Sequence, residues 1–556
     1  MKRRNRIIEQ YIGLCLGILL CLPIQSKAKN HIAFNDAAST MILKSVQPLA
    51  KNNFLLRLYG QLLFVPVWMQ EERLSPLSQA LFSEIIQDET LLKTSRLKRD
   101  AIRLKEESES CYRRFSTLKE KISLEFKISQ LYKGYADYIL YGSINWGAFQ
   151  ARLYNLRKKS IKAEWITYKP KFSPISLLES AAMRGDLSEM FQKASPKEYH
   201  YAMLKQALYS LIEIKKSGGW GKVSFKGILR PGKVSSFVPI LRERLRKSRD
   251  YSECEKEETT QYDTCLTDAV IHFQKRHGLV AKGIVGKETL KGLNVSVEQR
   301  IKEVRLNLDR IKWLHQRDSK RHLIINIPAF TLFFEKDEKL IQKMRVITGR
   351  KTHPTPIFSN TVKSIVLNPS WNVPKSIIQK EMIPKLMRNP NAMAKKGIEI
   401  RRGWGENAEK IDASSIDWSQ YRYSKHMPFH FAQVPGYKNA LGKVKFLFPN
   451  QFSVYMHDTP NKNLFKRNVR AFSHGCIRLQ KPRELLKTFS TFNESVDFEK
   501  AQERLKGKKK AYLTLTEQVP VDVVYLTAYV DYDGILQFRN DIYGYDKIQL
   551  QSYRNW

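Results

Sequence analysis

Residues 29–215 carry apolar side chains at the three- and four-residue spacing that is typical of amphipathic helices. The pattern is clearest over 77–92 and 118–131, and proline and glycine interrupt it near 170–174. Aromatic residues gather in stretches such as 58–68, which favours packing between helices over a binding surface. We therefore predict a helical scaffold domain over 29–215, and we find no catalytic constellation in it.

The pattern over 216–297 predicts a smaller helical unit. An amphipathic helix is expected at 238–245, and a second one is expected to bury Phe273. Gly278 follows that second helix at the position of a C-cap glycine, and a turn at Gly283 leads to a third, short helix. These signals predict a module of three helices.

Beyond residue 298 the pattern changes from helices to strands. Short apolar or alternating runs typical of strands occur at 323–327, 330–334, 344–347, 364–367, 452–456 and 523–529. The interval 372–430 is rich in lysine, arginine and proline, and it reads as helical. We therefore predict a multidomain α+β protein, whose last domain, 298–556, is mainly β with a helical lid inserted over 372–430.

The charge balance narrows the possible partners. Lysine and arginine number 96 against 54 aspartate and glutamate, which gives a net charge of +42. A surplus of this size favours anionic partners such as nucleic acid, a membrane surface or an acidic polymer.

The first 28 residues argue against nucleic acid as the partner. A basic run at 1–6 precedes an apolar stretch at 11–24, and small residues follow it, as in a secretory signal peptide. An uncleaved membrane anchor is the alternative interpretation. We expect an exported, periplasmic protein with no nucleic-acid partner.

Export also changes the interpretation of the cysteines. Outside the signal segment they are Cys111, Cys254, Cys265 and Cys476. Cys254 and Cys265 bracket a polar, acidic segment, so an oxidising compartment favours a local disulfide between them. Cys476 needs another explanation.

Cys476 ends the sequence Ser473-His474-Gly475-Cys476, and His457 lies a short distance before it. A thiol becomes a strong nucleophile when a histidine takes its proton, and glycine lets backbone N–H groups approach a developing oxyanion. Either His457 or His474 could be the base, and the other histidine would then be structural. The residues alone also allow an inert, buried cysteine.

His457 together with Ser473-His474-Gly475-Cys476-Ile477-Arg478 resembles the catalytic signature of the L,D-transpeptidases with a YkuD-type domain. The stretches 326–334, 367–374, 435–450 and 529–544 are similar to those of the large multidomain Gram-negative members. Residues 216–297 resemble the peptidoglycan-binding module, with Lys282 in place of the usual acidic residue. That departure leaves open whether the module binds or only packs.

The resemblance implies a YkuD-like β-sandwich and a set of site residues. It implies that Cys476 is the nucleophile and that His457 is the base, oriented by the carbonyl of Asp458. Gly475 and Cys476 would offer N–H groups to the oxyanion, with the Tyr455 hydroxyl nearby. We doubt a role for the Asp458 carboxylate, because neighbouring residues of a strand face opposite ways.

A further group of residues is expected to bind substrate. It comprises Tyr455, Trp371, Asn439, Ser473, His474 and Arg478. Arg478 could pair with a stem-peptide carboxylate or, equally well, with loop carbonyls. His426 and His430 have helical spacing, but Pro428 between them argues against a helical metal site, so we expect neither metal nor cofactor.

The expected function is formation of 3→3 peptidoglycan crosslinks from tetrapeptide stems. The expected partners are peptidoglycan stem peptides, with other cell-wall synthesis proteins as a further class. One alternative is an L,D-carboxypeptidase, in which water instead of an amine resolves the thioester. The other alternative is a catalytically silent scaffold protein that binds the cell wall.

Overall fold

The computed structural model describes residues 28–92, 94–114, 116–252, 260–315, 319–403 and 408–553. The chain divides into two compact units, one formed by residues up to 140 with 171–195, the other by 141–170 with 196–554. The predicted signal peptide lies outside the described residues, apart from Ala28. In the described part of the chain, no helix combines the length and apolarity needed to cross a membrane.

The first unit is helical, as the sequence pattern predicts. Its helices are α2 (Ala28–Val46), α3 (Phe54–Gln61), α4 (Pro76–Gln87), α5 (Arg96–Arg113), α6 (Leu118–Tyr141), α8 (Pro174–Arg184) and α9 (Leu187–Ala194). Ser75 and Ser95 accept hydrogen bonds from backbone N–H groups in the first turns of α4 and α5, which fixes where these helices begin. One apolar core, which includes Trp68 and Tyr132, joins the helices.

A buried carboxylate holds the loop between α3 and α4 against that core. Glu125 of α6 is fully buried and accepts hydrogen bonds from the backbone N–H groups of Val67, Trp68 and Met69. The Tyr59 hydroxyl also donates to it, at 2.8 Å. Burial raises the pKa of Glu125 to about 7, although these hydrogen bonds oppose the rise. This cluster is an anchor for the fold, because its donors are all internal.

The second unit contains the predicted three-helix module. Its helices are α11 (Val238–Lys247), α12 (Thr264–Arg276) and α13 (Lys287–Leu293). Leu241, Leu266 and Phe273 lie in its core, and Gly278 follows α12 with a φ of +64°. Two longer helices, α10 (Tyr201–Lys216) and α14 (Val297–Lys312), pack against each other beside it, and α7 (Trp146–Lys158) belongs to the same unit.

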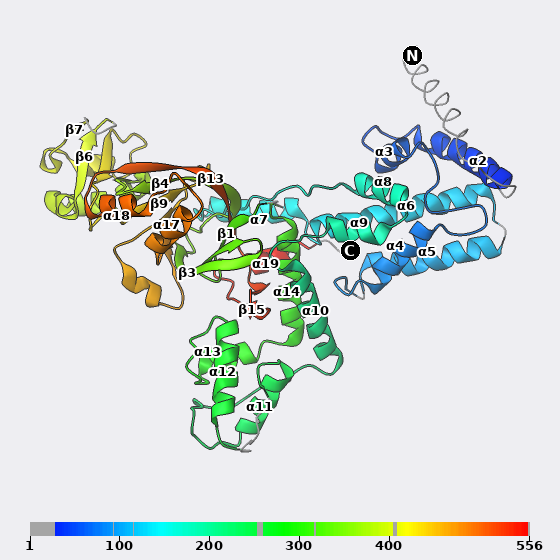
Figure 1. Cartoon of the computed structure of the whole chain (residues 1–556), viewed down its shortest axis with the longest axis horizontal. Helices are drawn as coiled ribbons and strands as arrows, with labels where there is room; N and C mark the ends of the chain where they lie inside the picture. Colours follow the sequence, from blue (N-terminus) through cyan, green and yellow to red (C-terminus); the bar gives the residue numbers. More distant parts are fainter. Residues whose placement is uncertain are drawn as a thin grey trace, which may run out of the picture. The chain divides into compact units, whose positions relative to one another are not determined.

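The catalytic-domain strands form one large sheet (Figure 1). They are β1 (Arg321–Asn326), β2 (Thr331–Lys336), β3 (Lys339–Gly349), β4 (Phe358–Leu367), β9 (Val444–Leu447), β10 (Met456–His457), β11 (Ala471–Ser473), β12 (Ile477–Leu479) and β13 (Ala511–Val524). Their order is β11-β3-β12-β10-β9-β4-β13-β1-β2, and β3 also pairs with β2. The sheet therefore curls back on itself, and its two walls enclose one apolar core.

Further elements complete this domain. They are the helices α17 (Pro482–Ser490), α18 (Phe498–Lys506) and α19 (Tyr545–Leu550), and the hairpin of β14 (Ala528–Val530) with β15 (Leu536–Phe538). Phe489 of α17 and Leu505 of α18 are buried in the core of the large sheet, so both helices pack against it. The result is the β-rich domain that the sequence predicts.

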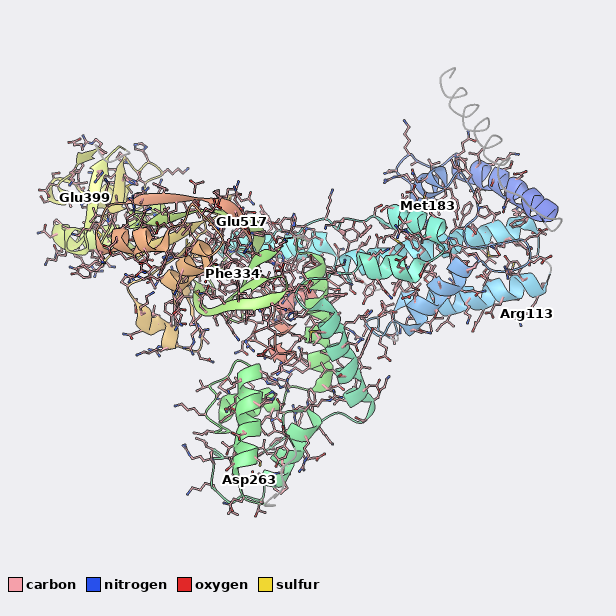
Figure 2. The ribbon with its side chains drawn as sticks, viewed as in Figure 1. Arg113, Met183, Asp263, Phe334, Glu399 and Glu517 are labelled. Atoms are coloured by element: carbon pink, nitrogen blue, oxygen red, sulfur yellow. The ribbon has the colours of Figure 1, made fainter. Side chains whose placement is uncertain are left out.

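The inserted interval differs from the helical lid that we expected. It contains a second sheet, built of β5 (Trp371–Asn372), β8 (Phe429–Gln433), β6 (Ile398–Arg402) and β7 (Glu409–Lys410), whose residue Glu399 is labelled in Figure 2. A helix packs on it, formed by α15 (Lys375–Ile377), a π-helical turn η1 (Ile378–Met382) and α16 (Ile383–Leu386). Buried and exposed residues alternate over 398–402 and 429–433, as in strands with one buried face. In the sequence this alternation is too short to be recognised as a strand signal among the surrounding lysine and proline residues.

The lid has a core of its own. Its buried members are Val373, Ile378, Met382, Ile383, Leu386, Met393, Ile398, Ile400, Trp418, Phe429 and Phe431. Trp418 contacts both Phe429 and Phe431, at ring distances of 5.4 Å and 5.6 Å. The insertion is thus a small α+β subdomain, which we continue to call the lid (residues 372–430).

Candidate active site

Cys476 lies in the turn that joins β11 to β12, and its thiol is free and half-buried. Gly475 has a φ of +117°, a conformation that residues with a side chain rarely adopt. Ser473 ties the turn together, because its hydroxyl accepts from the Gly475 N–H at 3.1 Å and donates to the Cys476 carbonyl at 2.6 Å. The sequence Ser-His-Gly-Cys therefore folds into a tight, side-chain-braced turn.

We expected the N–H groups of both Gly475 and Cys476 to be oxyanion donors, but the hydrogen bond to Ser473 occupies one of them. The Gly475 N–H already donates to Ser473, whereas no described residue accepts a hydrogen bond from the Cys476 N–H. The Cys476 N–H is therefore the donor that remains available to a substrate oxygen.

His457 lies on β10, between two neighbouring strands. It is opposite Arg478 in the parallel pair with β12, and opposite Lys445 in the antiparallel pair with β9. Its side chain is 4% exposed. Residues opposite one another in a sheet project to the same face, so a histidine and two cations share the face beside the Cys476 turn.

A backbone carbonyl fixes the tautomer of His457. The Nδ1 atom lies 2.5 Å from the carbonyl oxygen of Asp458, and a carbonyl can only accept, so Nδ1 carries the proton. Burial lowers the pKa of His457 to about 3, with further lowering by Arg478, Lys445 and Lys462, while the Asp458 contact opposes the shift. The imidazole is neutral at ordinary pH, and Nε2 has its lone pair free to accept a proton.

The Asp458 carboxylate is used elsewhere. It accepts from the backbone N–H groups of Lys443 and Thr459 and from the Lys462 ammonium. The side chain thus supports the loop behind the histidine, and only its carbonyl touches the imidazole.

Burial raises the pKa of the Cys476 thiol. The Tyr455 N–H and hydroxyl, and the charges of Lys445 and Arg478, oppose that rise. The resting pair is accordingly a neutral thiol and a neutral imidazole, in surroundings that can stabilise a thiolate when it forms.

Lys445 is a residue that the sequence analysis missed. Its ammonium lies 3.7 Å from the centre of the Tyr455 ring, and burial lowers its pKa while the charge of Cys476 opposes the shift. The only signal was a lysine between the apolar Val444 and Phe446, in a stretch where the sequence analysis predicted no strand. Such an alternation is normal for a half-solvated strand, and nothing local reveals what lies on the polar face.

His474 points to the lid. Its Nε2 lies 2.7 Å from Glu381 Oε1 and 2.9 Å from an Arg350 guanidinium nitrogen, and its ring meets His353 edge-on at 5.3 Å. Of the two candidate histidines, His457 is the one whose ring nitrogen is oriented by a carbonyl, while His474 connects the catalytic turn to the lid.

Arg478 is half-buried, and burial lowers the pKa of its guanidinium. Its Nε atom is buried without a hydrogen-bond partner, and no described carbonyl accepts from the side chain. The loop-carbonyl alternative for Arg478 therefore finds no support among the described residues.

Trp371 and Asn439 occupy different situations. Trp371 lies on β5, half-buried at the edge of the lid, opposite Gln433 of β8. Asn439 is 1% exposed; its amide donates to the carbonyls of Pro369 and Val434, and its oxygen accepts from the Leu441 N–H. The Asn439 side chain is satisfied within the fold, where it supports the loop after β8.

The remaining predictions concern cysteines and metals. Cys265 is disulfide-bonded, and Cys254, which we predicted as the partner of Cys265, lies outside the described residues. Cys111 is free and buried. His430 is on a strand and lies 3.3 Å from the Asn372 side-chain oxygen. Among the described residues, no group of three His, Cys, Asp or Glu side chains could hold a metal ion.

Three segments of the chain match known protein families. Residues 320–497 match the L,D-transpeptidase catalytic domain of the YkuD family, residues 53–208 a scaffold domain, and residues 235–293 a domain described as "Putative peptidoglycan binding domain". The chain therefore contains an L,D-transpeptidase catalytic domain of the YkuD type and a domain of the peptidoglycan-binding type.

A protein of Haemophilus influenzae described as "Putative L,D-transpeptidase" is 32% identical over 241 residues. The alignment covers 43% of this chain and 47% of that protein, so the chain matches about half the length of this relative.

Solved structures of L,D-transpeptidases are also similar. The one from Stackebrandtia nassauensis is 14% identical with a TM-score of 0.21, covering 55% of this chain and 96% of that one. The one from Mycobacterium smegmatis is 13% identical with a TM-score of 0.17, covering 37% of this chain and 58% of that one. Scores this low do not establish a common overall architecture.

Proposed function

We propose that this protein is an exported L,D-transpeptidase that forms 3→3 peptidoglycan crosslinks through a thioester on Cys476. The observation that carries the proposal is the contact between His457 Nδ1 and the Asp458 carbonyl at 2.5 Å. It leaves a neutral imidazole with an unprotonated Nε2 beside the Cys476 turn, as a general base requires.

In the first half-reaction the Cys476 sulfur attacks the carbonyl that joins the third residue of a tetrapeptide stem to the terminal D-alanine. His457 Nε2 takes the thiol proton as the carbon–sulfur bond forms. In this proposal the Cys476 N–H and the Tyr455 hydroxyl donate to the oxyanion; the interaction of Tyr455 with the Cys476 thiol supports the second donor. The imidazolium then gives its proton to the leaving amine, and D-alanine departs.

In the second half-reaction the side-chain amine of another stem attacks the thioester. Neutral His457 takes a proton from that amine, and the thiolate leaves and regains a proton. The products are a 3→3 crosslink and the resting thiol. Lys445 and Arg478 favour both steps, because sulfur carries negative charge as the carbon–sulfur bond forms and as it breaks.

Arg478 has a second role in the proposal. Its unpartnered, buried Nε could donate to a stem-peptide carboxylate, with the fork geometry that suits this group. Trp371 would contribute an apolar surface at the edge of the lid, and His474 would position the lid through Glu381. Asn439 would act indirectly, by supporting the loop after β8.

Hydrolysis is the alternative outcome of the same thioester. The lid favours an amine over water as acceptor, because a subdomain that closes over the groove excludes bulk water. A silent scaffold is the less favoured alternative, since the Asp458 carbonyl that holds the Nδ1 proton of His457 and the Ser473 hydroxyl that braces the Cys476 turn both support a catalytic role.

The remaining parts of the proposal concern the whole chain. We assign residues 1–28 to a signal peptide, 29–215 to the scaffold, 216–297 to the peptidoglycan-binding-like module and 298–556 to the catalytic domain. The net charge of +42 would hold the protein near anionic polymers in the periplasm. Other cell-wall synthesis proteins are proposed as partners of the scaffold.

The test is to incubate the protein that lacks residues 1–28 with a disaccharide-tetrapeptide and to weigh the products. A dimer that has lost one D-alanine supports the proposal, and a tripeptide alone supports the carboxypeptidase. Neither product should form with Cys476→Ser. A carbapenem should add covalently to Cys476, as peptide mapping would show; an adduct elsewhere would refute the assignment of the nucleophile.

A further inference from the structure

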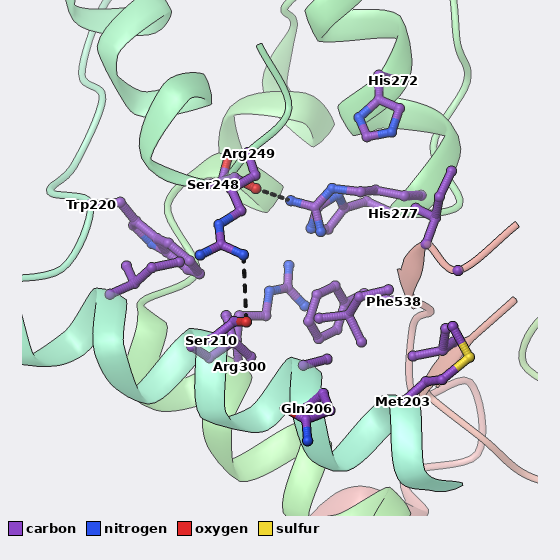
Figure 3. A pocket seen from close by; sticks show the side chains of 18 of the residues that line it. Met203, Gln206, Ser210, Trp220, Ser248, Arg249, His272, His277, Arg300 and Phe538 are labelled. Atoms are coloured by element: carbon purple, nitrogen blue, oxygen red, sulfur yellow. Dashed lines mark hydrogen bonds between the residues drawn. The ribbon is translucent and has the colours of Figure 1, made fainter. Parts of the chain in front are cut away.

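A cationic pocket lies outside the candidate active site, in the second unit. It has a volume of about 580 Å³ and is lined by residues of α10, α11, α12, α14 and the β14–β15 hairpin. Figure 3 shows Trp220, Arg249, His277, Arg300 and Phe538 around one common space. Its volume is within the range of pockets that hold small ligands, roughly 300–1,000 Å³.

The lining carries an excess of positive charge. Arg244, Arg249, Arg276 and Arg300 all line the pocket, and none of its described lining residues is acidic. Two carboxylates behind the lining offset part of this charge: Asp250 pairs with Arg276, and Glu303 pairs with Arg300 at 2.7 Å. Arg244 and Arg249 have no such acidic partner among the described residues.

Arg244 is the strongest indication of a missing ligand. It is 3% exposed, and its Nε and Nη2 atoms both donate to the Leu293 carbonyl. Its Nη1 atom is buried and donates to no described acceptor. Burial lowers the pKa of this guanidinium to about 9, with Arg276 and Arg300 lowering it further and Asp250 opposing. A buried, charged donor without an acceptor is costly unless a bound anion supplies one.

Aromatic rings complete the pocket. The Arg244 guanidinium lies 4.3 Å from the centre of the Trp220 ring, and the Arg300 guanidinium lies 4.3 Å from the centre of the Phe538 ring. These contacts hold both cations in place. They also leave apolar edges that suit the carbon skeleton or sugar ring of an organic anion better than a bare inorganic ion.

We propose that this pocket binds a peptidoglycan fragment through the free carboxylates of its stem peptide. The identity of the ligand rests on the proposed function, whereas the anionic character of the ligand follows from the arginines alone. Arg244 and Arg249 would each donate to a carboxylate, and Trp220 and Phe538 would contact the apolar part of the fragment. The site would hold wall material apart from the stem that reacts at Cys476.

The experiment uses the protein that lacks residues 1–28, with Cys476 first alkylated so that the catalytic groove is blocked. The probe is a disaccharide-tripeptide, which has free carboxylates and no D-alanine to lose, and binding is measured by calorimetry. Arg249→Asn removes an exposed cation at a φ of +59°, which asparagine tolerates. Arg244→Lys keeps the charge but removes the fork. Lys275→Gln, on the exposed face of α12, is the matched control.

We expect both arginine variants to weaken binding of the probe by about tenfold or more, and the control to leave it unchanged. Thermal unfolding of each variant checks that the module stays folded. Absence of probe binding, or equal binding by Arg249→Asn and the parent protein, would overturn the proposal. Tight binding of inorganic phosphate with no binding of the probe would also overturn it, in favour of a phosphate ligand.

The two proposals can fail separately. The carbapenem adduct on Cys476 and the crosslinked dimer depend on the catalytic domain, and Arg249→Asn should leave the adduct intact. If crosslinking fails while probe binding still depends on Arg244 and Arg249, only the proposed function falls. If crosslinking succeeds and the arginine variants bind normally, only the pocket assignment falls.

Discussion

Glu381 of the lid and His474 of the catalytic turn are in direct contact, with Oε1 and Nε2 2.7 Å apart. Glu381 lies in the π-helical turn η1, and such turns are frequent at functional sites. His474 is two residues before Cys476, so the position of the lid and the conformation of the turn are mechanically linked.

Breaking this contact should lower crosslinking more than it lowers stability. We expect Glu381→Ala to reduce the rate of crosslinking by about tenfold, because a loosened lid no longer positions both stems. The pair is partly exposed, so the free energy of unfolding should change by less than about 1 kcal/mol. Steady-state product formation and thermal unfolding measure the two effects. Glu409→Ala, on an exposed strand of the same lid, is the control.

The charge state of the catalytic pair predicts its pH dependence. Because the pKa of His457 is lowered to about 3, the imidazole stays neutral, and crosslinking should show no acid limb near pH 6.5. Because the thiol pKa is raised, the alkylation rate of Cys476 should keep rising with pH beyond its ordinary pKa, without a plateau between about pH 4 and 8. A plateau there would indicate a stable thiolate–imidazolium pair and contradict the structure.

His457→Ala separates the base from the nucleophile. Crosslinking should be lost, since the proposal assigns the thiol proton to His457, while Cys476 should still react slowly with iodoacetamide. His474→Ala should reduce crosslinking less, because His474 contacts the lid and not the thiol. If His474→Ala were the more damaging change, the assignment of the base would have to be exchanged.

Lys445 should stabilise the thiolate. We expect Lys445→Met to raise the thiol pKa further and to slow alkylation of Cys476 at neutral pH by roughly threefold to tenfold, as loss of a nearby cation implies. Lys443→Met is the matched control, since its ammonium donates to the Gly507 carbonyl instead. Equal alkylation rates for the two variants would exclude an electrostatic role for Lys445.

A buried ion pair predicts how stability of the large sheet depends on pH. Burial alone would lower the pKa of His322, but Asp522 at 2.6 Å and Glu335 at 3.1 Å raise it to about 9. The folded-state pKa exceeds the unfolded value of about 6.5, so this stabilisation, about 3 kcal/mol, is fully present below pH 6.5 and is lost as the pH rises through 9.

Hydrogen exchange in β1 and β13 reports this loss. His322→Gln should remove the part of the pH dependence between about pH 6.5 and 9, whereas the exposed His426→Gln should retain it. A sheet whose protection in the parent protein stays constant across this range would show that His322 is not charged in the fold.

Local sequence signals predicted several helices and strands, but the strand expected at 452–456 overlaps β10 (Met456–His457) only at Met456. The helix expected at 238–245 is α11 (Val238–Lys247), and the strand expected at 323–327 overlaps β1 (Arg321–Asn326). Apolar periodicity is a local property, so it can be read without knowing the neighbours. The short strands β6 and β8 of the lid were missed, because a few alternating residues inside a basic, proline-containing interval give a weak signal.

The candidate active site could be predicted from the sequence only around a segment of consecutive residues with a recognisable pattern. Ser473-His474-Gly475-Cys476 is such a segment, and His457 was found with it. Lys445 and Glu381 were not found, since each reaches the site through a tertiary contact, one by pairing of β9 with β10 and the other by the fold of the lid. Nothing in their own neighbourhoods distinguishes them from other charged surface residues.

The strands that flank the lid, β5 and β8, are hydrogen-bonded to each other. Trp371 and Asn372 of β5 pair with Gln433 and Ala432 of β8, so the chain leaves and rejoins the catalytic domain at adjacent points. An insertion with adjacent ends and a core of its own can be exchanged without disturbing its host. A lid transplanted from a related protein at this pair of strands should therefore leave the host sheet folded, and the turn of Cys476 should keep its support only if the new lid retains a carboxylate in place of Glu381.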